Sequence, residues 1–248
     1  MITLDGKRFL VAGASSGIGA ATALLLNRLG ACVIAVARRA DALEAVRSAS
    51  AQPENFLIEP FDLTAQIAPL NAWLKAIVAR TGLLDGMVHC AGVCAMVPLA
   101  LVDDSHLTHT LSTNVLSAVR LAKAVLDRRH NTGKGASLVF IASTAAQHEN
   151  AGLAAYAASK GAIVSLVRSL ACECAPRGIR VNALSPGLIP TPQTEKLFGE
   201  SLAARAALYP LGVGTPEDIA QTAAFLLSPA ARWITGQNIT VDGGKGLL

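Results

Sequence analysis

Tyr156 and Lys160 are the residues of this sequence best suited to acid–base chemistry. They lie four positions apart in an alanine-rich stretch of helical composition, so they share one helix face. A free tyrosine has a pKa of about 10 and is a poor acid–base group at neutral pH. A neighbouring ammonium favours the phenolate, so we expect Lys160 to lower the pKa of Tyr156. Such a pair suits acid–base catalysis on an alcohol or ketone, although an ordinary exposed helix pair has the same spacing.

Ser143 is a second candidate. It directly follows an apolar run at 137–142 and precedes Tyr156 by thirteen residues. If that run is a strand of a parallel sheet, Ser143 lies at the carboxyl edge, where doubly wound folds bind ligands. Its hydroxyl would then be placed to hold a substrate carbonyl oxygen.

The segment 11–19 reads Val-Ala-Gly-Ala-Ser-Ser-Gly-Ile-Gly and separates the first apolar run from the first helical stretch. Small residues at such a turn let the backbone approach a pyrophosphate at the positive end of the helix. The spacing is G-x-x-x-G-x-G rather than the usual G-x-G-x-x-G. The alternative is a tight strand-to-helix turn without a ligand.

Residues 13–17 also match the nucleophile elbow of hydrolases, G-x-S-x-G. A hydrolase needs an acid and a histidine further along, and the sequence offers Asp62, Asp85, His106, His109, His130 and His148. The elbow would lie on the first strand and leave Gly19 without a role, so we favour dinucleotide binding. A P-loop is excluded because no Lys-Ser/Thr pair follows the glycines.

The elements that must position these residues alternate along the chain. Short apolar runs predict strands at 9–12, 32–37, 56–59, 86–89, 137–142, 179–183 and 238–241, and longer stretches predict helices at 17–29, 41–50, 66–80, 104–129, 153–175 and 216–227. This alternation is typical of βαβ units with right-handed crossovers. We therefore expect an α/β fold with a doubly wound parallel sheet of about seven strands and helices on both faces.

The length of 248 residues is consistent with a single domain, 1–248. Residues 187–214 show no clear pattern, and so long a connection predicts a substrate loop. With 52% hydrophobic and 15% charged residues, disorder is excluded. The mean hydropathy is +0.46, yet no run of about 18 apolar residues is free of charges and turn residues. We therefore expect a sheet buried on both faces and no membrane span.

Charge and cysteine content exclude other classes. The net charge is +4, without a basic tail, so we expect no nucleic-acid partner. The five cysteines form no CxxC pair and are typical of free thiols in an intracellular protein, so we expect a cytoplasmic location. The nearest approach to a zinc ligand set, His89 with Cys90 and Cys94, straddles a glycine turn, so we expect no metal.

Cofactor preference is encoded after the second predicted strand, where Arg38 and Arg39 follow Ala37. A fold that prefers NAD usually carries an acid here, bound to the ribose 2′-hydroxyl. Alanine leaves room for a 2′-phosphate, and a guanidinium forms charge-assisted hydrogen bonds with it. We expect NADP(H), bound by Arg38 with help from Arg39. The alternative is two solvated surface arginines.

Together these motifs resemble the short-chain dehydrogenase/reductase family over the whole chain. Further matches are Asn114 in a predicted helix, Ala91-Gly92 after the fourth strand, Ser185-Pro186-Gly187 after the sixth, and the segments 234–237 and 241–244 near the end. The agreement of independent features makes this resemblance far more specific than any single motif.

The resemblance implies a one-domain Rossmann fold in which a nicotinamide cofactor exchanges hydride with a carbinol carbon. Tyr156 would be the acid/base, Lys160 its pKa modulator and a ribose ligand, Ser143 the holder of the substrate oxygen, and Asn114 the support for a relay water. The implied cofactor-binding residues are Gly13, Ser15, Ser16, Gly17, Ile18, Gly19, Arg38, Arg39, Asp62, Leu63, Ala91, Gly92, Tyr156, Lys160, Pro186, Gly187 and Ile189. For Asp62, an adenine contact competes with a helix cap.

The chain also departs from the family pattern. Ala12 replaces a usual threonine, and His89-Cys90 replaces a usual Asn-Asn pair. We interpret His89 as a packed strand-end residue rather than a proton donor to a ligand.

We expect an NADP(H)-dependent oxidoreductase that interconverts a small-molecule ketone and a secondary alcohol. The length and tail motifs also resemble β-ketoacyl reductases, which act on acyl carrier protein or coenzyme A thioesters. Residues 128–130, Arg-Arg-His, could contact an acidic carrier, but Cys172 stands where those reductases commonly have arginine. A non-catalytic NADP-binding regulator is a remote alternative, because it would usually lack Tyr156 or Lys160.

Assembly follows from helix composition. Residues 104–129 and 153–175 are rich in alanine and leucine around much of the helix circumference, which indicates a second partner. In the family these two helices form a subunit interface, so we expect a homotetramer, or failing that a dimer.

Overall fold

A computed structural model of the chain describes residues 2–148 and 151–247. Its strands form one sheet of seven parallel strands in the order β3-β2-β1-β4-β5-β6-β7. The strands are β1 (Arg8–Ala12), β2 (Cys32–Ala37), β3 (Phe56–Pro60), β4 (Gly86–His89), β5 (Ser137–Ile141), β6 (Arg180–Pro186) and β7 (Asn238–Val241). The strand order turns back between β1 and β4, so the expected doubly wound Rossmann sheet is confirmed.

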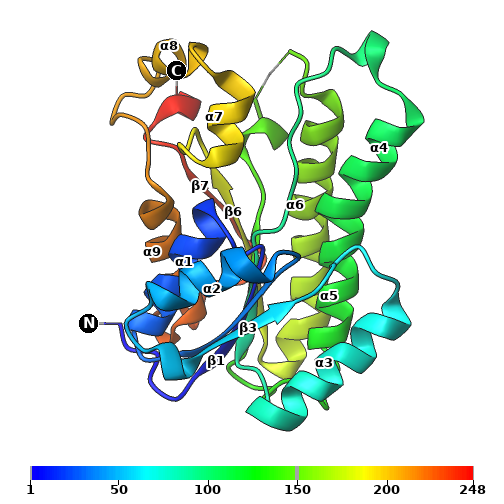
Figure 1. The fold of residues 1–248 in the computed structure, drawn as a ribbon, viewed down its shortest axis with the longest axis vertical. Coiled ribbons are helices and arrows are strands. Elements are labelled where there is room, and N and C mark those ends of the chain that lie inside the picture. The colour runs from blue at the N-terminus through cyan, green and yellow to red at the C-terminus, as the bar shows by residue number, and fades with distance from the viewer. Residues whose placement is uncertain (1, 149–150, 248) are drawn as a thin grey trace.

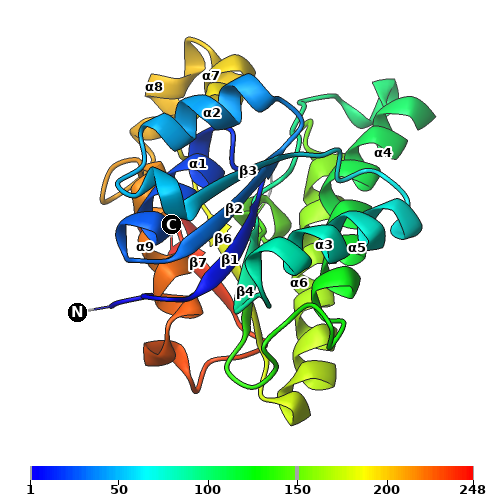
Figure 2. The same cartoon turned by 60° about the horizontal axis from the view of Figure 1, so that its bottom comes forward.

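Helices cover both faces of this sheet (Figures 1 and 2). On one face lie α1 (Gly17–Arg28), α2 (Ala40–Ser48) and α9 (Pro216–Leu227), and on the other α3 (Ile67–Thr81), α4 (Asp104–Leu111), α5 (Ser117–Val125) and α6 (Ala154–Cys174). The shorter α7 (Pro192–Phe198) and α8 (Ser201–Ala206) lie beyond the carboxyl ends of the strands, at the top left of Figure 1.

The strand alternation explains the high hydropathy. In β1, Leu10 and Ala12 pack against α3, α5 and α6, whereas Phe9 and Val11 pack against α1 and α9. Both faces of the sheet pack against a helix layer, so most strand residues on both faces are apolar. Among the described residues, no helix is long and apolar enough to cross a bilayer.

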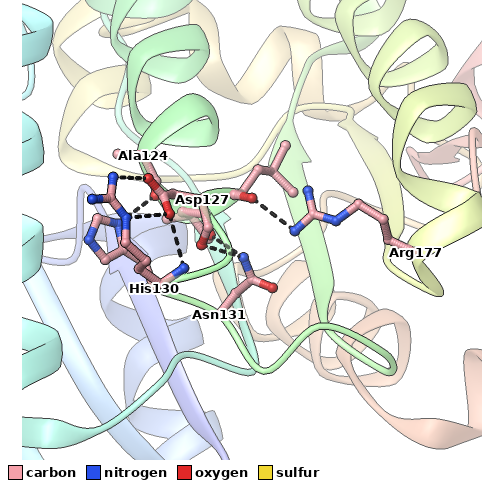
Figure 3. Close-up of polar contacts among 8 residues, drawn as sticks. Ala124, Asp127, His130, Asn131 and Arg177 are labelled. Atoms are coloured by element: carbon pink, nitrogen blue, oxygen red, sulfur yellow. Dashed lines mark hydrogen bonds and ion pairs between the residues drawn. The ribbon is translucent and has the colours of Figure 1, made fainter.

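The helix predicted at 104–129 is interrupted. A π-helical turn, Ser112–Leu116, separates α4 from α5, and α5 ends at Val125. Side chains donate hydrogen bonds to the last backbone carbonyls of α5 (Figure 3). His130 Nδ1 donates to the carbonyl of Ala124 at 2.8 Å, and Asn131 Nδ2 donates to the carbonyl of Val125 at 2.8 Å. Because these groups satisfy the last carbonyls, the helix stops four residues earlier than predicted.

The segment 187–214, predicted to be a loop without regular structure, contains the two helices α7 and α8. Thr191 and Thr194 form a reciprocal capping box at the start of α7, with Pro192 at the first helical position. Helices of seven and six residues are too short to show a hydrophobic period, which is why the sequence displays no pattern. The preceding strand, β6, runs to Pro186 instead of ending at Ala183.

Candidate active site

A cleft opens at the carboxyl ends of β1, β4, β5 and β6, where the sheet order turns back. It has an outer part of about 860 Å³ and an inner part of about 120 Å³. The two parts share Ile18, Cys90, Gly92, Thr191 and Gln193, so they are continuous. Among the predicted residues, the outer part is lined by Gly13, Ser15, Ser16, Gly17, Ile18, Gly19, Arg38, Arg39, Asp62, Leu63, Ala91 and Gly92, and the inner part by Ser143, Tyr156, Lys160, Pro186, Gly187 and Ile189.

In the glycine turn, the backbone of Gly13 lies against the backbone of the loop after β4, and the backbone of Gly19 lies against that of Gly13. Gly13 has φ +81°, and a Cβ there would lie 2.7 Å from the nitrogen of Ala91. A Cβ on Gly19 would meet the carbonyl of Gly13. The N-cap of α1, Ser16, makes no side-chain capping bond. The first amides of α1 are therefore not satisfied by a side-chain cap, as a pyrophosphate site at a helix N-terminus requires.

The residues predicted to bind the adenosine half of the cofactor line the outer part of the cleft. Ala37 ends β2 there, and Arg38 and Arg39 are exposed beside it. Asp62 accepts hydrogen bonds from the backbone nitrogen and hydroxyl of Thr64 at 2.9 and 2.8 Å. These bonds, with a smaller contribution from Arg38, lower the pKa of Asp62. The N-cap of α3 is Gln66, so Asp62 closes a turn rather than capping that helix.

Ser143, Tyr156 and Lys160 meet in the inner part of the cleft. Ser143 accepts a hydrogen bond from the nitrogen of Ala145 at 3.1 Å, and its hydroxyl is hydrogen-bonded to Tyr156. Lys160 Nζ lies 5.8 Å from the centroid of the Tyr156 ring and donates to the carbonyl of Ile141 at 2.8 Å. The structure thus brings together three of the four predicted catalytic side chains around one pocket.

The expected pKa of Tyr156 is wrong in direction. Burial raises the pKa of the phenol, the neighbouring Cys94 adds to the rise, and the hydrogen bond to Ser143 only partly opposes it. Burial also lowers the pKa of Lys160 from 10.5 to about 8, although Cys90 and Cys94 partly oppose this. Spacing along a helix gives proximity but not the depth of burial, which here is the larger effect. Tyr156 is therefore a neutral phenol in this protein environment.

Asn114, the fourth predicted residue, lies in the π-helical turn and is 1% exposed. Its Oδ1 accepts from the nitrogen of Val93 at 2.7 Å, and its Nδ2 donates to the carbonyl of Val93 and to Ser159 Oγ, both at 2.9 Å. Asn114 therefore joins the loop after β4 to α6 next to Lys160. Its support of a relay water stays a prediction.

His89 is a packed strand-end residue, as predicted. It is 2% exposed, its Nε2 lies 3.0 Å from Ser117 Oγ, and its ring stacks on Phe140. Burial, followed by the charge of Lys160, lowers its pKa to about 3, so the imidazole is neutral. In the described part of the chain, no three His, Cys, Asp or Glu side chains gather as a metal site would require.

The sequence did not indicate Thr191, Gln193 and Thr194, which also line the inner part of the cleft. With its amide oriented to match both neighbours, Gln193 donates to the carbonyl of Gly92 at 3.3 Å and accepts from the nitrogen of Cys94 at 2.9 Å. The Thr-Pro pair at 191–192 is a helix-start signal that could have revealed α7.

Two candidates of the hydrolase alternative, Asp62 and His109, line the outer part of the cleft together with Ser15. The carboxylate of Asp62, however, already accepts two hydrogen bonds from Thr64. Asp85 binds Lys7 at 3.1 Å and the nitrogen of Arg8 at 2.9 Å. The histidine candidate His130 lies on the α5–β5 connection, at the opposite edge of the sheet. The hydrogen bonds that Asp62 and Asp85 already make argue against a catalytic triad built on the glycine turn.

Known proteins resemble this chain along its whole length. The family model described as enoyl-(acyl carrier protein) reductase matches residues 13–245. The 3-oxoacyl-[acyl-carrier-protein] reductase FabG of Vibrio cholerae serotype O1 is 36% identical over 248 residues, which cover all of both chains. The protein of that name from Escherichia coli K12 is 34% identical over 249 residues, again covering both chains completely.

Solved structures agree in fold. A short-chain dehydrogenase/reductase described as glucose/ribitol dehydrogenase, from Brucella melitensis, superimposes with a TM-score of 0.92 at 32% identity, covering 98% of each chain. A short-chain dehydrogenase/reductase from Serratia marcescens gives 0.89 at 33% identity, with the same coverage. With the cleft and its Ser143, Tyr156 and Lys160 as described, the chain belongs to the short-chain dehydrogenase/reductase family of oxidoreductases, which use nicotinamide cofactors.

Proposed function

We propose that this protein is an NADP(H)-dependent oxidoreductase that interconverts a ketone and a secondary alcohol, with Tyr156 as the acid/base. One observation carries the proposal: Ser143, Tyr156 and Lys160 line an inner pocket that continues into an outer cleft lined by the glycine turn, Arg38 and Asp62. A non-catalytic regulator would have no reason to keep this arrangement beside its cofactor site.

The chain's own groups suit proton transfer to a carbonyl oxygen. Ser143 Oγ already accepts from Ala145, so its hydroxyl proton is available to a substrate oxygen in place of Tyr156. The neutral phenol of Tyr156 is the acid that protonates the developing alkoxide during reduction. Lys160, buried beside it, stabilises the phenolate that remains. A nicotinamide dinucleotide supplies the hydride when it is bound.

The cofactor we propose is NADP(H). Ala37 leaves the end of β2 without a carboxylate, and the exposed Arg38 and Arg39 lie on the same wall of the outer cleft. A 2′-phosphate there would meet one or two guanidinium groups. Among the described residues that line the outer cleft, Asp62 is the one acid, and its carboxylate accepts hydrogen bonds from Thr64 within its own turn.

A β-ketoacyl thioester is the second candidate substrate, because the curated relatives are named as 3-oxoacyl-[acyl-carrier-protein] reductases. The basic residues 128–130 support a carrier protein only weakly. Arg129 forms an ion pair with Asp127 at 2.6 Å, and His130 is buried. Of the three residues, Arg128 is therefore the exposed one with no ion pair in the described part of the chain. Cys172 is exposed on α6 and adds no positive charge. These features favour a small ketone or a coenzyme A thioester over a carrier-bound one.

We further propose that the chain is a single dinucleotide-binding and catalytic domain, that residues 187–214 are its substrate loop, and that it works in the cytoplasm as a homotetramer. Tyr209 supports the loop assignment: its hydroxyl accepts from the nitrogen of Leu188 at 2.9 Å, beside Gly187 of the inner pocket. Exposed apolar side chains on and before α4 and α5 support assembly: Leu99, Leu101, Leu107, Leu111, Leu116 and Val119.

The proposal is tested by following NADPH absorbance with a panel of ketones, a 3-oxoacyl coenzyme A, the same acyl group on a carrier protein, and an enoyl thioester. We expect oxidation of NADPH with at least one ketone or 3-oxoacyl compound. Activity confined to the enoyl thioester, or no binding of either dinucleotide, would refute a ketone reductase.

A further inference from the structure

His89 occupies a position that the ketone chemistry above does not use. It ends β4 and directly precedes Cys90, Ala91 and Gly92, which line the dinucleotide cleft. The resemblance to the family leads us to expect asparagine at this position, where this chain has histidine. Its ring is buried, and its neutral state leaves one nitrogen that donates and one that accepts.

The hydrogen bonds around His89 have a defined direction. Ser117 Oγ donates its one proton to the carbonyl of Thr113. Towards His89, 3.0 Å away, Ser117 is therefore placed to accept, and we infer that Nε2 carries the imidazole proton. A hydrogen bond between the ring and the backbone of His89 itself raises the pKa of the imidazole and competes for that one proton. A chain of donors thus runs from the end of β4 through Ser117 to Thr113, in the π-helical turn.

The next residue of that turn is Asn114, which holds both backbone groups of Val93. The π-helical turn is therefore hydrogen-bonded to the cleft wall at two points. Thr113 of the turn is linked to His89 through Ser117, and Asn114 binds Val93 directly. Between these two points lie Ala91 and Gly92. The same amide of Asn114 reaches Ser159, the neighbour of Lys160. A π-helical turn inside a helix is common at functional sites, and it needs contacts that hold its register.

We propose that His89 is a positioning residue: through Ser117 it fixes the π-helical turn, and so sets both the Ala91–Gly92 wall of the cofactor cleft and the placement of Asn114 against α6. The inference rests on the proposed function, because it assigns His89 a role in dinucleotide binding and turnover. His89 itself touches neither reacting group.

Three variants separate this role from simple packing. His89→Leu fills a similar volume without a donor, His89→Gln keeps an N–H near the position of Nε2, and Ser117→Ala removes the middle of the chain. The matched control is His130→Leu. His130 is also buried and donates to a backbone carbonyl at a helix end (Figure 3). Its own carbonyl accepts from the nitrogen of Leu84, just before β4 begins, so it lies at the amino ends of the strands, away from the cleft.

We expect His89→Leu and Ser117→Ala to lower kcat about tenfold and to weaken NADPH binding measured by fluorescence, with KM for the ketone little changed. The double variant should be no worse than either single one, because both break the same chain. His89→Gln should stay within about threefold of wild type, a difference of less than about 0.7 kcal/mol. His130→Leu should lower Tm and leave kcat unchanged.

The proposal is overturned if folded His89→Leu keeps the wild-type kcat and NADPH affinity. It is also overturned if kcat falls only in step with Tm, as a packing defect would produce, without rescue by His89→Gln. Should His89→Leu fail to fold, Ser117→Ala decides by the same criteria.

Imidazole ¹⁵N shifts of the protein without added ligand give a readout independent of activity. We expect the Nε2–H tautomer for His89, with a changed shift in Ser117→Ala; an Nδ1–H tautomer would overturn the proposal. If the wild type binds NADPH but reduces no ketone, the proposed function fails, and the tautomer and NADPH affinities still decide the role of His89.

Discussion

Lys160 Nζ donates a hydrogen bond of 2.8 Å to the carbonyl of Ile141, the last residue of β5. This bond ties α6 to the strand end that carries Ser143. Tyr156 lies one turn before Lys160 on the same helix, so the bond also contributes to the separation between the phenol and Ser143. A backbone contact, rather than the Y-x-x-x-K spacing alone, fixes the geometry of the three groups.

Lys160→Met should therefore lose both the charge and the tether. We expect kcat to fall by at least about 10²-fold, in the range of lost acid–base catalysis. Lys160→Arg should also be impaired, because the longer guanidinium does not fit the site of a buried ammonium. Steady-state kinetics with NADPH and a ketone measure the effect. Near-normal turnover in Lys160→Met would show that the ammonium is dispensable.

Lys160 should also leave a signature in the pH dependence of stability. Its pKa falls from 10.5 to about 8 on folding, so between these pH values the unfolded chain binds a proton that the folded chain does not. The free energy of unfolding contributed by this group therefore rises with pH, and the burial penalty is fully present below about pH 8.

The measurement is urea unfolding of wild type and Lys160→Met from about pH 7 to about pH 9.5. The wild type should gain stability relative to the variant above about pH 8. Cys90 and Cys94, whose pKa values burial raises to about 12 and about 11, oppose the rise above pH 9 in both proteins. A difference independent of pH would contradict a lowered pKa for Lys160.

The sequence predicted the features that depend on residues close together in the chain. Buried strands such as β1 read as continuous apolar runs, and α9 begins at Pro216 as predicted, behind a capping box of Thr215 and Asp218. The glycine turn and the pairing of Tyr156 with Lys160 are likewise local patterns.

Features that depend on tertiary contacts were not predicted. The π-helical turn at 112–116 depends on contacts with Val93 and His89, which are distant in sequence. The raised pKa of Tyr156 depends on how deeply α6 packs against β5 and β6. The contact of Gln193 with the loop after β4 depends on where α7 lies, and no periodicity reports that.

Cofactor preference gives a prediction in the outer cleft. We expect NADPH to exceed NADH by at least about tenfold in kcat/KM, which is about 1.4 kcal/mol. Ala37→Asp combined with Arg38→Leu should reverse the preference, because a carboxylate repels a 2′-phosphate and binds a 2′-hydroxyl. The measurement is kcat/KM with each dinucleotide at saturating ketone. Equal efficiency in the wild type, or an unchanged ratio in the double variant, would sink the assignment of Arg38.

The exposed apolar side chains around α4 and α5 predict assembly. Leu116 and Val119 are 42% and 39% exposed, on helices expected to meet a second subunit. Light scattering at micromolar concentration should give four times the chain mass of 25.5 kDa, or twice that mass for a dimer. Leu116→Asp with Val119→Asp should reduce the mass, because unpaired carboxylates would be buried at the interface. A wild-type monomer would argue against the tetramer.

Tyr156→Phe tests the central claim most directly. The substitution removes the phenolic proton while it keeps the buried ring, so the fold and the dinucleotide cleft should be retained. We expect kcat for ketone reduction to fall by about 10²–10⁴-fold, with the dissociation constant for NADPH little changed. Retention of most of the wild-type turnover would show that Tyr156 is not the acid/base and would contradict the proposed mechanism.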